Sequence, residues 1–109
     1  MITFVNLLVR KEGLTHPDFL ERWQGDHIDL ATELPGLERY ATSTPTDPAK
    51  SPYDGIVRLS FPDQQTMSEA FDSEVGKEVQ ADAATFADMG ASEILIVEET
   101  THVERETTE

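Results

Sequence analysis

Residues 19–40, FLERWQGDHIDLATELPGLERY, decide how the rest of the chain is interpreted. Apolar and aromatic residues recur here at steps of three and four, the period of one face of an α-helix. That face carries Phe19, Trp23, His27, Leu30, Ala31 and Leu34. The pattern predicts one helix over about residues 15–33, closed by Pro35 and Gly36. A histidine within this stripe needs a hydrogen-bond partner or a cavity, because burying it unpaired is costly.

Four strand-like segments surround this helix. They are rich in β-branched and aromatic residues and are bounded by turn-forming residues. In chain order they are residues 2–9, 37–44, 55–61 and 94–97. Between the last two, Asp63 begins a second helical region, which breaks at residues 73–76 and then resumes. The order strand, helix, strand, strand, helix, strand predicts an α+β, ferredoxin-like fold with a four-stranded antiparallel sheet.

The first strand has apolar side chains on both faces, because Phe4 and Leu8 alternate with Val5 and Leu7. A domain of this kind packs its helices on one face of the sheet and leaves the other face bare. A monomer should not expose a large apolar patch, so we expect a second copy to cover it. The prediction is a homodimer whose two sheets meet face to face as a dimeric α/β barrel.

The chain is strongly acidic, with 22 aspartate and glutamate residues, 8 lysine and arginine residues, and a formal net charge of −14. This charge repels phosphate backbones and anionic lipids, so we expect neither nucleic acid nor a membrane as a partner. Three explanations stay open: an ordinary acidic surface, adaptation to high salt, or mimicry of nucleic acid toward a basic partner. Because the acids are spread along the chain rather than gathered in blocks, we favour salt adaptation.

The length of 109 residues suits one domain, which we place at residues 1–100, followed by an acidic tail at residues 101–109. The absence of cysteine excludes disulfides, thiolate catalysis and sulfur-ligated metals. The apolar run at residues 2–9 is too short to cross a bilayer and follows no basic segment, unlike a secretion signal. We therefore expect a cytoplasmic protein.

Five short motifs follow one another along the chain. They are Phe19-x-x-x-Trp23-x-x-x-His27, LPGLERY at residues 34–40, Asp54-Gly55, AFDSEVG at residues 70–76 and IVEE at residues 96–99. Their order and spacing resemble the EthD family over residues 1–100. The loop at residues 45–52 and the acidic tail belong to this sequence rather than to the family pattern.

The resemblance implies a dimeric α/β barrel of ferredoxin-like domains, with a cavity between the helices and the sheet of each subunit. The namesake family is linked to the degradation of a fuel ether, in an accessory role. Similar barrels include cofactor-free monooxygenases, haem-handling enzymes, muconolactone isomerases, and fungal decarboxylases or dehydratases. The fold alone does not select among these reactions.

His27 is the leading candidate for chemistry, because an imidazole exchanges protons near neutral pH. The alternative is a core histidine bonded to a backbone carbonyl. Tyr40 either donates its hydroxyl to a carbonyl ligand or ends a strand with its hydroxyl in water. The aromatic residues expected to line the pocket are Trp23, Phe61 and Phe86.

Other polar residues are weaker candidates. Arg58 is more simply the partner of an acid than of an anionic substrate, and Tyr53 more simply ends a strand. Asp26, His27 and Asp29 have the chemistry of metal ligands, but their spacing cannot converge on one helix face, so we expect no metal. The sequence has no phosphate-binding glycine loop, nucleophile elbow or paired carboxylates, and we expect no cofactor.

Two functional hypotheses remain. In the first, the protein is an enzyme for a small aromatic or carbonyl compound, with His27 moving a proton and Tyr40 orienting the oxygen. In the second, it is a non-catalytic module that binds a small molecule or a partner. A cavity with a free imidazole nitrogen favours the enzyme, and a filled core with His27 bonded to backbone favours the module.

Overall fold

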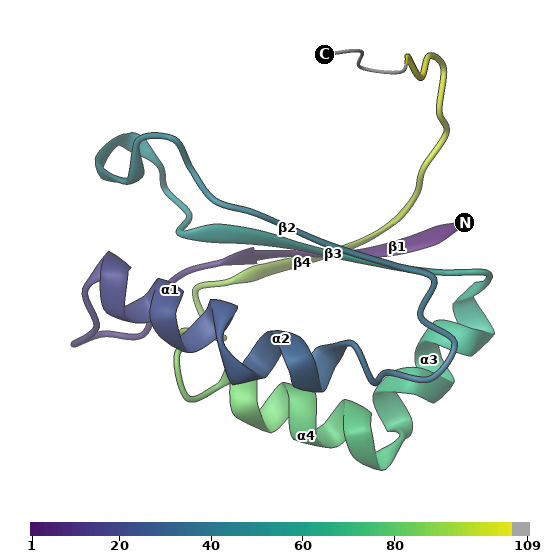
Figure 1. Cartoon of the computed structure of the whole chain (residues 1–109), viewed down its shortest axis with the longest axis horizontal. Coiled ribbons are helices and arrows are strands. Elements are labelled where there is room, and N and C mark those ends of the chain that lie inside the picture. The colour runs from purple at the N-terminus through teal and green to yellow at the C-terminus, as the bar shows by residue number, and fades with distance from the viewer. Residues whose placement is uncertain (106–109) are drawn as a thin grey trace.

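Four antiparallel strands form a single sheet in the order β2-β3-β1-β4. The computed structural model describes residues 1–105, and its strands are β1 (Ile2–Leu8), β2 (Arg39–Ser43), β3 (Gly55–Phe61) and β4 (Glu93–Glu98). The central strands β1 and β3 pair along their whole length, from Ile2 opposite Phe61 to Leu8 opposite Gly55. The predicted α+β, ferredoxin-like fold is confirmed (Figure 1).

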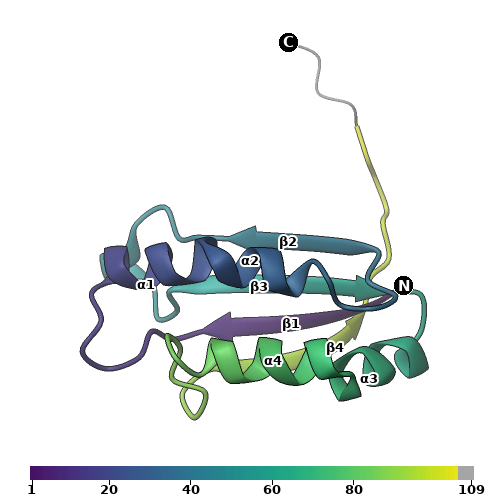
Figure 2. The ribbon, with the colours of Figure 1, turned by 60° about the horizontal axis from the view of Figure 1, so that its bottom comes forward.

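The α-helices of the described chain cover one face of this sheet (Figures 1 and 2). They are α1 (His16–Gln24), α2 (Asp26–Ala31), α3 (Gln64–Asp72) and α4 (Glu74–Ala83). A short 3-10 helix, η1 (Pro48–Lys50), lies in the proline-rich loop between β2 and β3. None of the described helices has the length and apolar character needed to cross a membrane.

The residues predicted to begin the two helical regions do so. The Thr15 hydroxyl accepts a hydrogen bond from the backbone N–H of Asp18 at 3.2 Å, at the start of α1. A carboxylate oxygen of Asp63 accepts one from the N–H of Thr66 at 2.7 Å, at the start of α3. Each bond satisfies an amide that a helix leaves unpaired in its first turn.

The single helix predicted over residues 15–33 is wrong, because the chain breaks at Gly25 into α1 and α2. The Gly25 backbone has φ −90° and ψ −125°, outside the helical region. A Cβ at this position would lie 2.9 Å from the carbonyl oxygen of Glu21, closer than real Cβ atoms come. Across the break, Phe19 and His27 still pack against the same ring, that of Phe86.

The core lies between the sheet and the helices. Its largest fully buried apolar side chains are Trp23, Phe19, Phe61 and Phe86. The Phe61 ring, at the end of β3, packs edge-on against Phe71 of α3, with 6.1 Å between ring centroids. Removing such large apolar surfaces from water is the main source of stability in a domain of this size.

The other face of the sheet carries no helix (Figure 1). Strand pairing places Val5 opposite Leu95 and Leu7 opposite Ile56 on this face. Strand β4 is exposed along its whole length, with Leu95 45% and Val97 37% exposed. We call these apolar residues, Val5, Leu7, Ile56, Leu95 and Val97, the outer patch.

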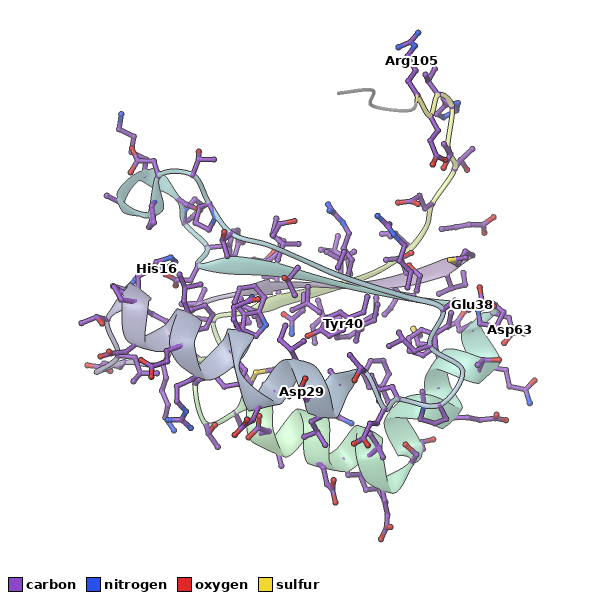
Figure 3. All side chains as sticks on the ribbon, viewed as in Figure 1. His16, Asp29, Glu38, Tyr40, Asp63 and Arg105 are labelled. Atoms are coloured by element: carbon purple, nitrogen blue, oxygen red, sulfur yellow. The ribbon has the colours of Figure 1, made fainter. Side chains whose placement is uncertain are left out.

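After β4 the chain leaves the sheet on the side that carries no helix and extends away from the domain, as the position of Arg105 shows (Figures 1 and 3). Residues 101–105 of the predicted acidic tail form neither helix nor strand. The remainder of that tail, residues 106–109, lies outside the described residues.

Few acidic side chains have a lysine or arginine partner. Within residues 1–105, such ion pairs join Arg10 to Asp54 and Lys50 to Asp47. Carboxylates without partners repel one another, and dissolved ions screen that repulsion. We therefore expect the melting temperature to rise steeply from low to molar KCl, as measured by thermal unfolding. A melting temperature that stays flat across that range would contradict the salt-adaptation hypothesis.

Candidate functional site

A cavity of about 510 Å³ lies between the sheet and the helices. Every second side chain of a strand faces the helices. The alternation of side chains along each strand therefore decides which residues form the floor of the cavity. Asn6 lies at the centre of that floor, opposite Val57 on one side and Ile94 on the other. Phe4 and Leu8 flank it along β1, so Asn6, a residue that is 6% exposed, places its side-chain amide among apolar neighbours.

The opposite wall holds a histidine–carboxylate pair. The Nδ1 of His27, on α2, lies 2.7 Å from Oδ2 of Asp82, on α4. The His27 side chain is 7% exposed and that of Asp82 is 41% exposed. The Phe86 ring packs edge-on against the imidazole, with 4.9 Å between ring centroids. A carboxylate at Nδ1 keeps the proton on that nitrogen, so Nε2 is left as the acceptor, which is the form of a general base.

Tyr40 adds a hydroxyl to the cavity from the sheet. It pairs with Leu59, and its side chain extends from β2 toward the helix layer (Figure 3). Burial raises the pKa of Tyr40 to about 12. The hydroxyl therefore stays protonated at neutral pH and acts as a hydrogen-bond donor rather than as a base.

Trp23 is fully buried and packs directly on β3. Its six-membered ring covers Gly55, where any Cβ would collide with the ring carbons Cζ3 and Cη2. The indole N–H has no hydrogen-bond partner among the described residues. Gly55 is thus required by the close approach of an aromatic ring and not by an unusual backbone angle.

The cavity brings together most of the predicted pocket residues, namely Trp23, His27, Tyr40 and Phe86, whose roles in binding or catalysis stay predictions. Phe61 does not line it. Phe61 faces the same side of β3 as Val57 and Leu59, but it lies at the end of the strand, where Phe71 of α3 packs over it. Arg58 is likewise absent from the cavity wall.

Two polar residues of this site were not predicted, although the sequence contains a signal for each. Asn6 interrupts an alternating apolar series between Phe4 and Leu8. Asp82 follows Val79 by three residues, next to the inward stripe of its helix. The partner of His27 is therefore a carboxylate and not the backbone carbonyl considered as the alternative.

The sequence pattern of the EthD domain matches residues 11–90 of the chain. The chain belongs to the EthD family. No curated protein matches it in sequence.

Solved structures with the fold of this EthD domain include proteins with and without a stated activity. An EthD family protein from Bacillus halodurans is 22% identical, with 92% of this chain and 99% of that protein covered and a TM-score of 0.79. SnoaB, a cofactor-independent oxygenase from Streptomyces nogalater, is 14% identical, with 94% of this chain and 97% of that protein covered and a TM-score of 0.71. A dimeric ferredoxin-like protein of unknown function from Thermobifida fusca is 19% identical, with 88% of each chain covered and a TM-score of 0.72. At these identities the likeness shows the fold alone.

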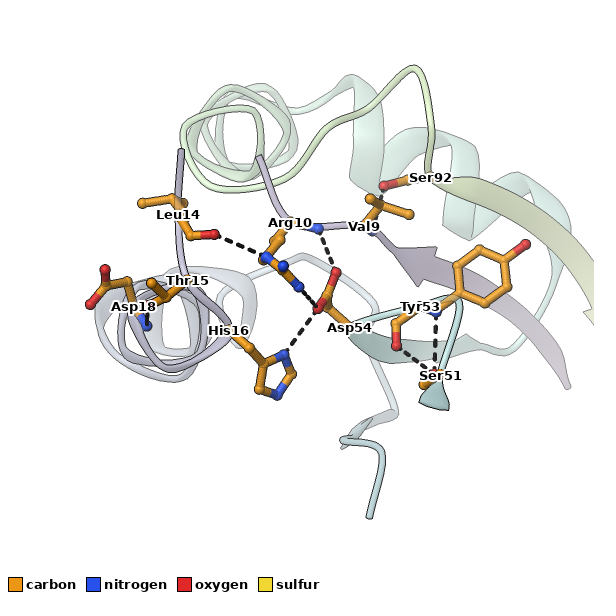
Figure 4. Close-up of polar contacts among 10 residues, drawn as sticks. All are labelled: Val9, Arg10, Leu14, Thr15, His16, Asp18, Ser51, Tyr53, Asp54 and Ser92. Carbon is orange, nitrogen blue, oxygen red and sulfur yellow. Dashed lines mark hydrogen bonds and ion pairs between the residues drawn. The ribbon is translucent and has the colours of Figure 1, made fainter. Parts of the chain in front are cut away.

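The Asp54-Gly55 motif of this EthD domain also organises a polar cluster outside the cavity (Figure 4). Asp54 accepts hydrogen bonds at 2.9 Å from both the backbone N–H and the guanidinium of Arg10. Its Oδ1 also lies 3.0 Å from Nδ1 of His16. Burial by itself raises the pKa of Asp54, but the hydrogen bonds from Arg10 and His16 outweigh burial and lower it. The cluster joins the starts of α1 and β3 to the residues that follow β1.

The lowered pKa makes Asp54 a source of pH-dependent stability. The carboxylate stabilises the fold above its unfolded-state pKa of about 4, and this contribution is lost as the pH falls through the lower folded-state pKa. We expect Asp54→Asn to unfold at lower denaturant concentration than the parent at pH 7, with the difference shrinking below pH 4. Denaturant titrations at pH 7, 4 and 3 measure this, with the exposed Asp72→Asn as the control. A difference that is constant over pH would contradict the assignment.

The acidic residues next to His27 in this EthD domain are not buried as His27 is. Asp26 and Asp29 are exposed, whereas His27 is buried. Within residues 1–105, no three histidine, aspartate or glutamate side chains are grouped so as to hold a metal ion.

Proposed function

We propose that this EthD domain is a cofactor-independent enzyme that moves a proton on a small aromatic or other apolar carbonyl compound. The observation that carries the proposal is the His27–Asp82 pair in the wall of an apolar cavity. A carboxylate that fixes one ring nitrogen orients the other toward a substrate, as general bases require. SnoaB supports the proposal as an example of this fold hosting chemistry without a cofactor.

The first step is proton removal from the carbon beside the carbonyl group. Nε2 of His27 takes the proton, and the electron pair of the broken C–H bond moves into the carbonyl group to form an enolate. The Tyr40 hydroxyl donates a hydrogen bond to the enolate oxygen, and Asp82 stabilises the imidazolium. Returning the proton to another carbon gives isomerisation, and loss of a neighbouring group from the enolate gives elimination.

Deuterium exchange into 1-tetralone tests this step without knowledge of the natural substrate. The probe has acidic hydrogens only beside its carbonyl group, and NMR in D2O follows their loss. We expect the parent protein to accelerate the exchange above the rate in buffer. Binding of the probe without accelerated exchange would identify the domain as a non-catalytic binding module, and the proposed function would fail.

We also infer that two copies of the chain pair through the outer patch. The patch is apolar, it continues onto a strand exposed along its whole length, and monomers rarely expose such surfaces. The neighbour from Thermobifida fusca, which is described as dimeric, supports the pairing of two copies.

Sedimentation in molar salt is therefore expected to give about twice the chain mass of 12.2 kDa. Leu95→Glu places a charge within the outer patch, so this variant is expected to sediment as a monomer. The matched control is Ser68→Glu, at an exposed position of α3, which should not change the mass. A compact monomer of the parent under these conditions would remove the basis for pairing.

A further inference from the structure

The outer face of the sheet carries basic side chains beside the outer patch. Arg58 of β3 pairs with Val5 of β1, which belongs to the outer patch, so both side chains lie on this face. Arg58 also pairs with Ala41 of β2, and Arg39 precedes Ala41 by two residues on the same face. The two arginines are therefore diagonal neighbours, about 7–8 Å apart in a regular sheet. We call Arg39 and Arg58 the arginine pair.

The arginine pair has no acidic partner within its own subunit. Both residues are exposed, and within residues 1–105 the ion pairs of lysine and arginine use Arg10 and Lys50 instead. The buried hydroxyls beside the pair, on Thr3 and Ser60, hydrogen-bond to each other at 2.9 Å. Two adjacent guanidinium groups without a carboxylate repel each other, although the chain has 22 acidic residues. Carboxylates from another molecule would explain this arrangement.

The proposed pairing of two copies makes carboxylates at this place necessary. The arginine pair adjoins the outer patch, so a second copy that covers the patch also removes water from the arginines. Taking a charge out of water without an opposite charge beside it is costly. A guanidinium group matches a carboxylate well, because two of its N–H groups donate in parallel to the two oxygens. The segment that covers the arginine pair therefore has to bring carboxylates.

An acidic segment leaves the sheet on this same side. Residues 99–105, which we call the C-terminal arm, have the sequence ETTHVER and contain Glu99 and Glu104. The arm extends away from its own subunit on the side of the outer face, as the position of Arg105 shows (Figure 3). All its residues are exposed, Val103 by 63%. Within the part of the chain that the structure describes, no ion pair involves the carboxylates of the arm.

The length of the arm suits a crossing to a second copy. Seven extended residues span about 23 Å, at about 3.3 Å per residue. A four-stranded sheet measures about 14 Å from its first strand to its last, at about 4.8 Å per step. An arm that begins beside β4 of one copy is therefore long enough to reach the β2–β3 side of its partner, which carries the arginine pair.

We propose that the arginine pair of one copy binds the carboxylates of the C-terminal arm of the second copy. In a two-fold symmetric dimer the contact occurs twice, because each copy gives its own arm and receives that of its partner. Val103 adds an exposed apolar side chain, which the neighbouring outer patch can cover. The inference rests on the proposed pairing through the outer patch, and it names the segment and the charges that lie beside that patch.

Two charge-reversed variants of the full chain test this contact. Arg39→Glu/Arg58→Glu makes the face acidic and keeps the acidic arm, whereas Glu99→Arg/Glu104→Arg makes the arm basic and keeps the arginine pair. Like charges then meet in each variant, so each is expected to dimerise at least tenfold more weakly than the parent. Sedimentation in moderate salt, where dissolved ions screen such contacts only in part, measures the association. Circular dichroism checks that the fold is retained, as expected for exposed positions.

The matched controls change the net charge equally at exposed positions on the helix side of the molecule. Lys11→Glu/Lys77→Glu is the control for the first variant, and Glu21→Arg/Glu78→Arg is the control for the second. Both controls are expected to dimerise within threefold of the parent, because none of these positions lies on the outer face.

Mixing the two variants separates a contact between copies from a contact within one copy. In a heterodimer, the acidic arm of one variant meets the unchanged arginine pair of the other, and the basic arm meets the new glutamates. Native mass spectrometry, which resolves the three dimers by mass, is expected to show the heterodimer exceeding either homodimer at least tenfold. An arm that binds its own subunit would be mismatched in both variants, so mixing them would not restore pairing.

The outcomes also separate this inference from the proposals beside it. If the parent is dimeric and both variants pair as tightly as their controls, the arm contact is overturned and pairing through the outer patch stands. Weakened variants that mixing does not restore would overturn the arm contact in the same way. A monomeric parent would overturn both the pairing and the arm contact. Absence of deuterium exchange in the parent, with restored heterodimers, would instead overturn only the enzyme.

Discussion

Gly55→Ala is expected to lower the free energy of unfolding by about 3 kcal/mol, the upper part of the range for an extra methyl group in a packed core. The added carbon would occupy the space of the Trp23 ring, which is fully buried and cannot retreat into solvent. Gly55 also begins β3 and pairs with Leu8 of the neighbouring central strand β1, so the strand cannot easily shift to make room. Chemical denaturation of parent and variant measures the loss.

The matched control for this change is Gly90→Ala. A Cβ at Gly90 would meet only Asp88 Oδ1 at 3.5 Å, an ordinary contact, so the stability should change by less than about 0.5 kcal/mol. The double variant Gly55→Ala/Trp23→Phe should be more stable than the sum of the single changes predicts, because the smaller ring makes room for the methyl group. Strict additivity would show that the collision between Gly55 and Trp23 is not the cause.

Asp82→Asn is expected to reduce the rate of deuterium exchange into 1-tetralone by about 10²- to 10⁴-fold. An asparagine amide can donate to Nδ1 of His27, which places the imidazole proton on Nε2 and removes the base. Asp82 is 41% exposed on its helix, so the fold should tolerate the change. The control is Asp26→Asn, an equal change of charge at an exposed position adjacent to His27.

His27→Ala removes the base itself, so the exchange rate is expected to fall to that in buffer. Loss of the ring also vacates volume beside Phe86, and we expect a destabilisation of about 1–2 kcal/mol by thermal unfolding. A large destabilisation with exchange and binding intact would falsify the functional assignment of His27.

The period of the apolar residues was enough to predict the sheet, because each strand and helix must turn one side to a common core. The third strand was predicted with the bounds that β3 has in the structure, Gly55–Phe61. The break at Gly25 was not predicted, since an isolated glycine is tolerated within a helix. Whether a glycine interrupts a helix depends on how the segments on either side of it pack, here α1 and α2, and local sequence does not determine that packing.

The candidate site was only partly predictable, because its residues come together through the packing of distant segments, which local sequence does not determine. Helical spacing placed His27 on the inward face, but its partner Asp82 lies 55 residues away and meets it only where α2 and α4 pack together. Phe61 was expected to line the pocket, and it does lie on the face of β3 that also carries Val57 and Leu59. The sequence could not show that the cavity stops short of that end of the strand, where α3 covers the ring.

The contact between His27 and Asp82 also has a mechanical consequence. Each residue belongs to a different helix, so one hydrogen bond both orients the imidazole and fastens α2 to α4 over the cavity. When the imidazole carries a proton taken from a substrate, this bond becomes an ion pair and strengthens. In the proposed reaction, the two helices are then held together most firmly while the enolate lies between them and the sheet. The contact between α2 and α4 thus strengthens on proton transfer and weakens when the proton is returned.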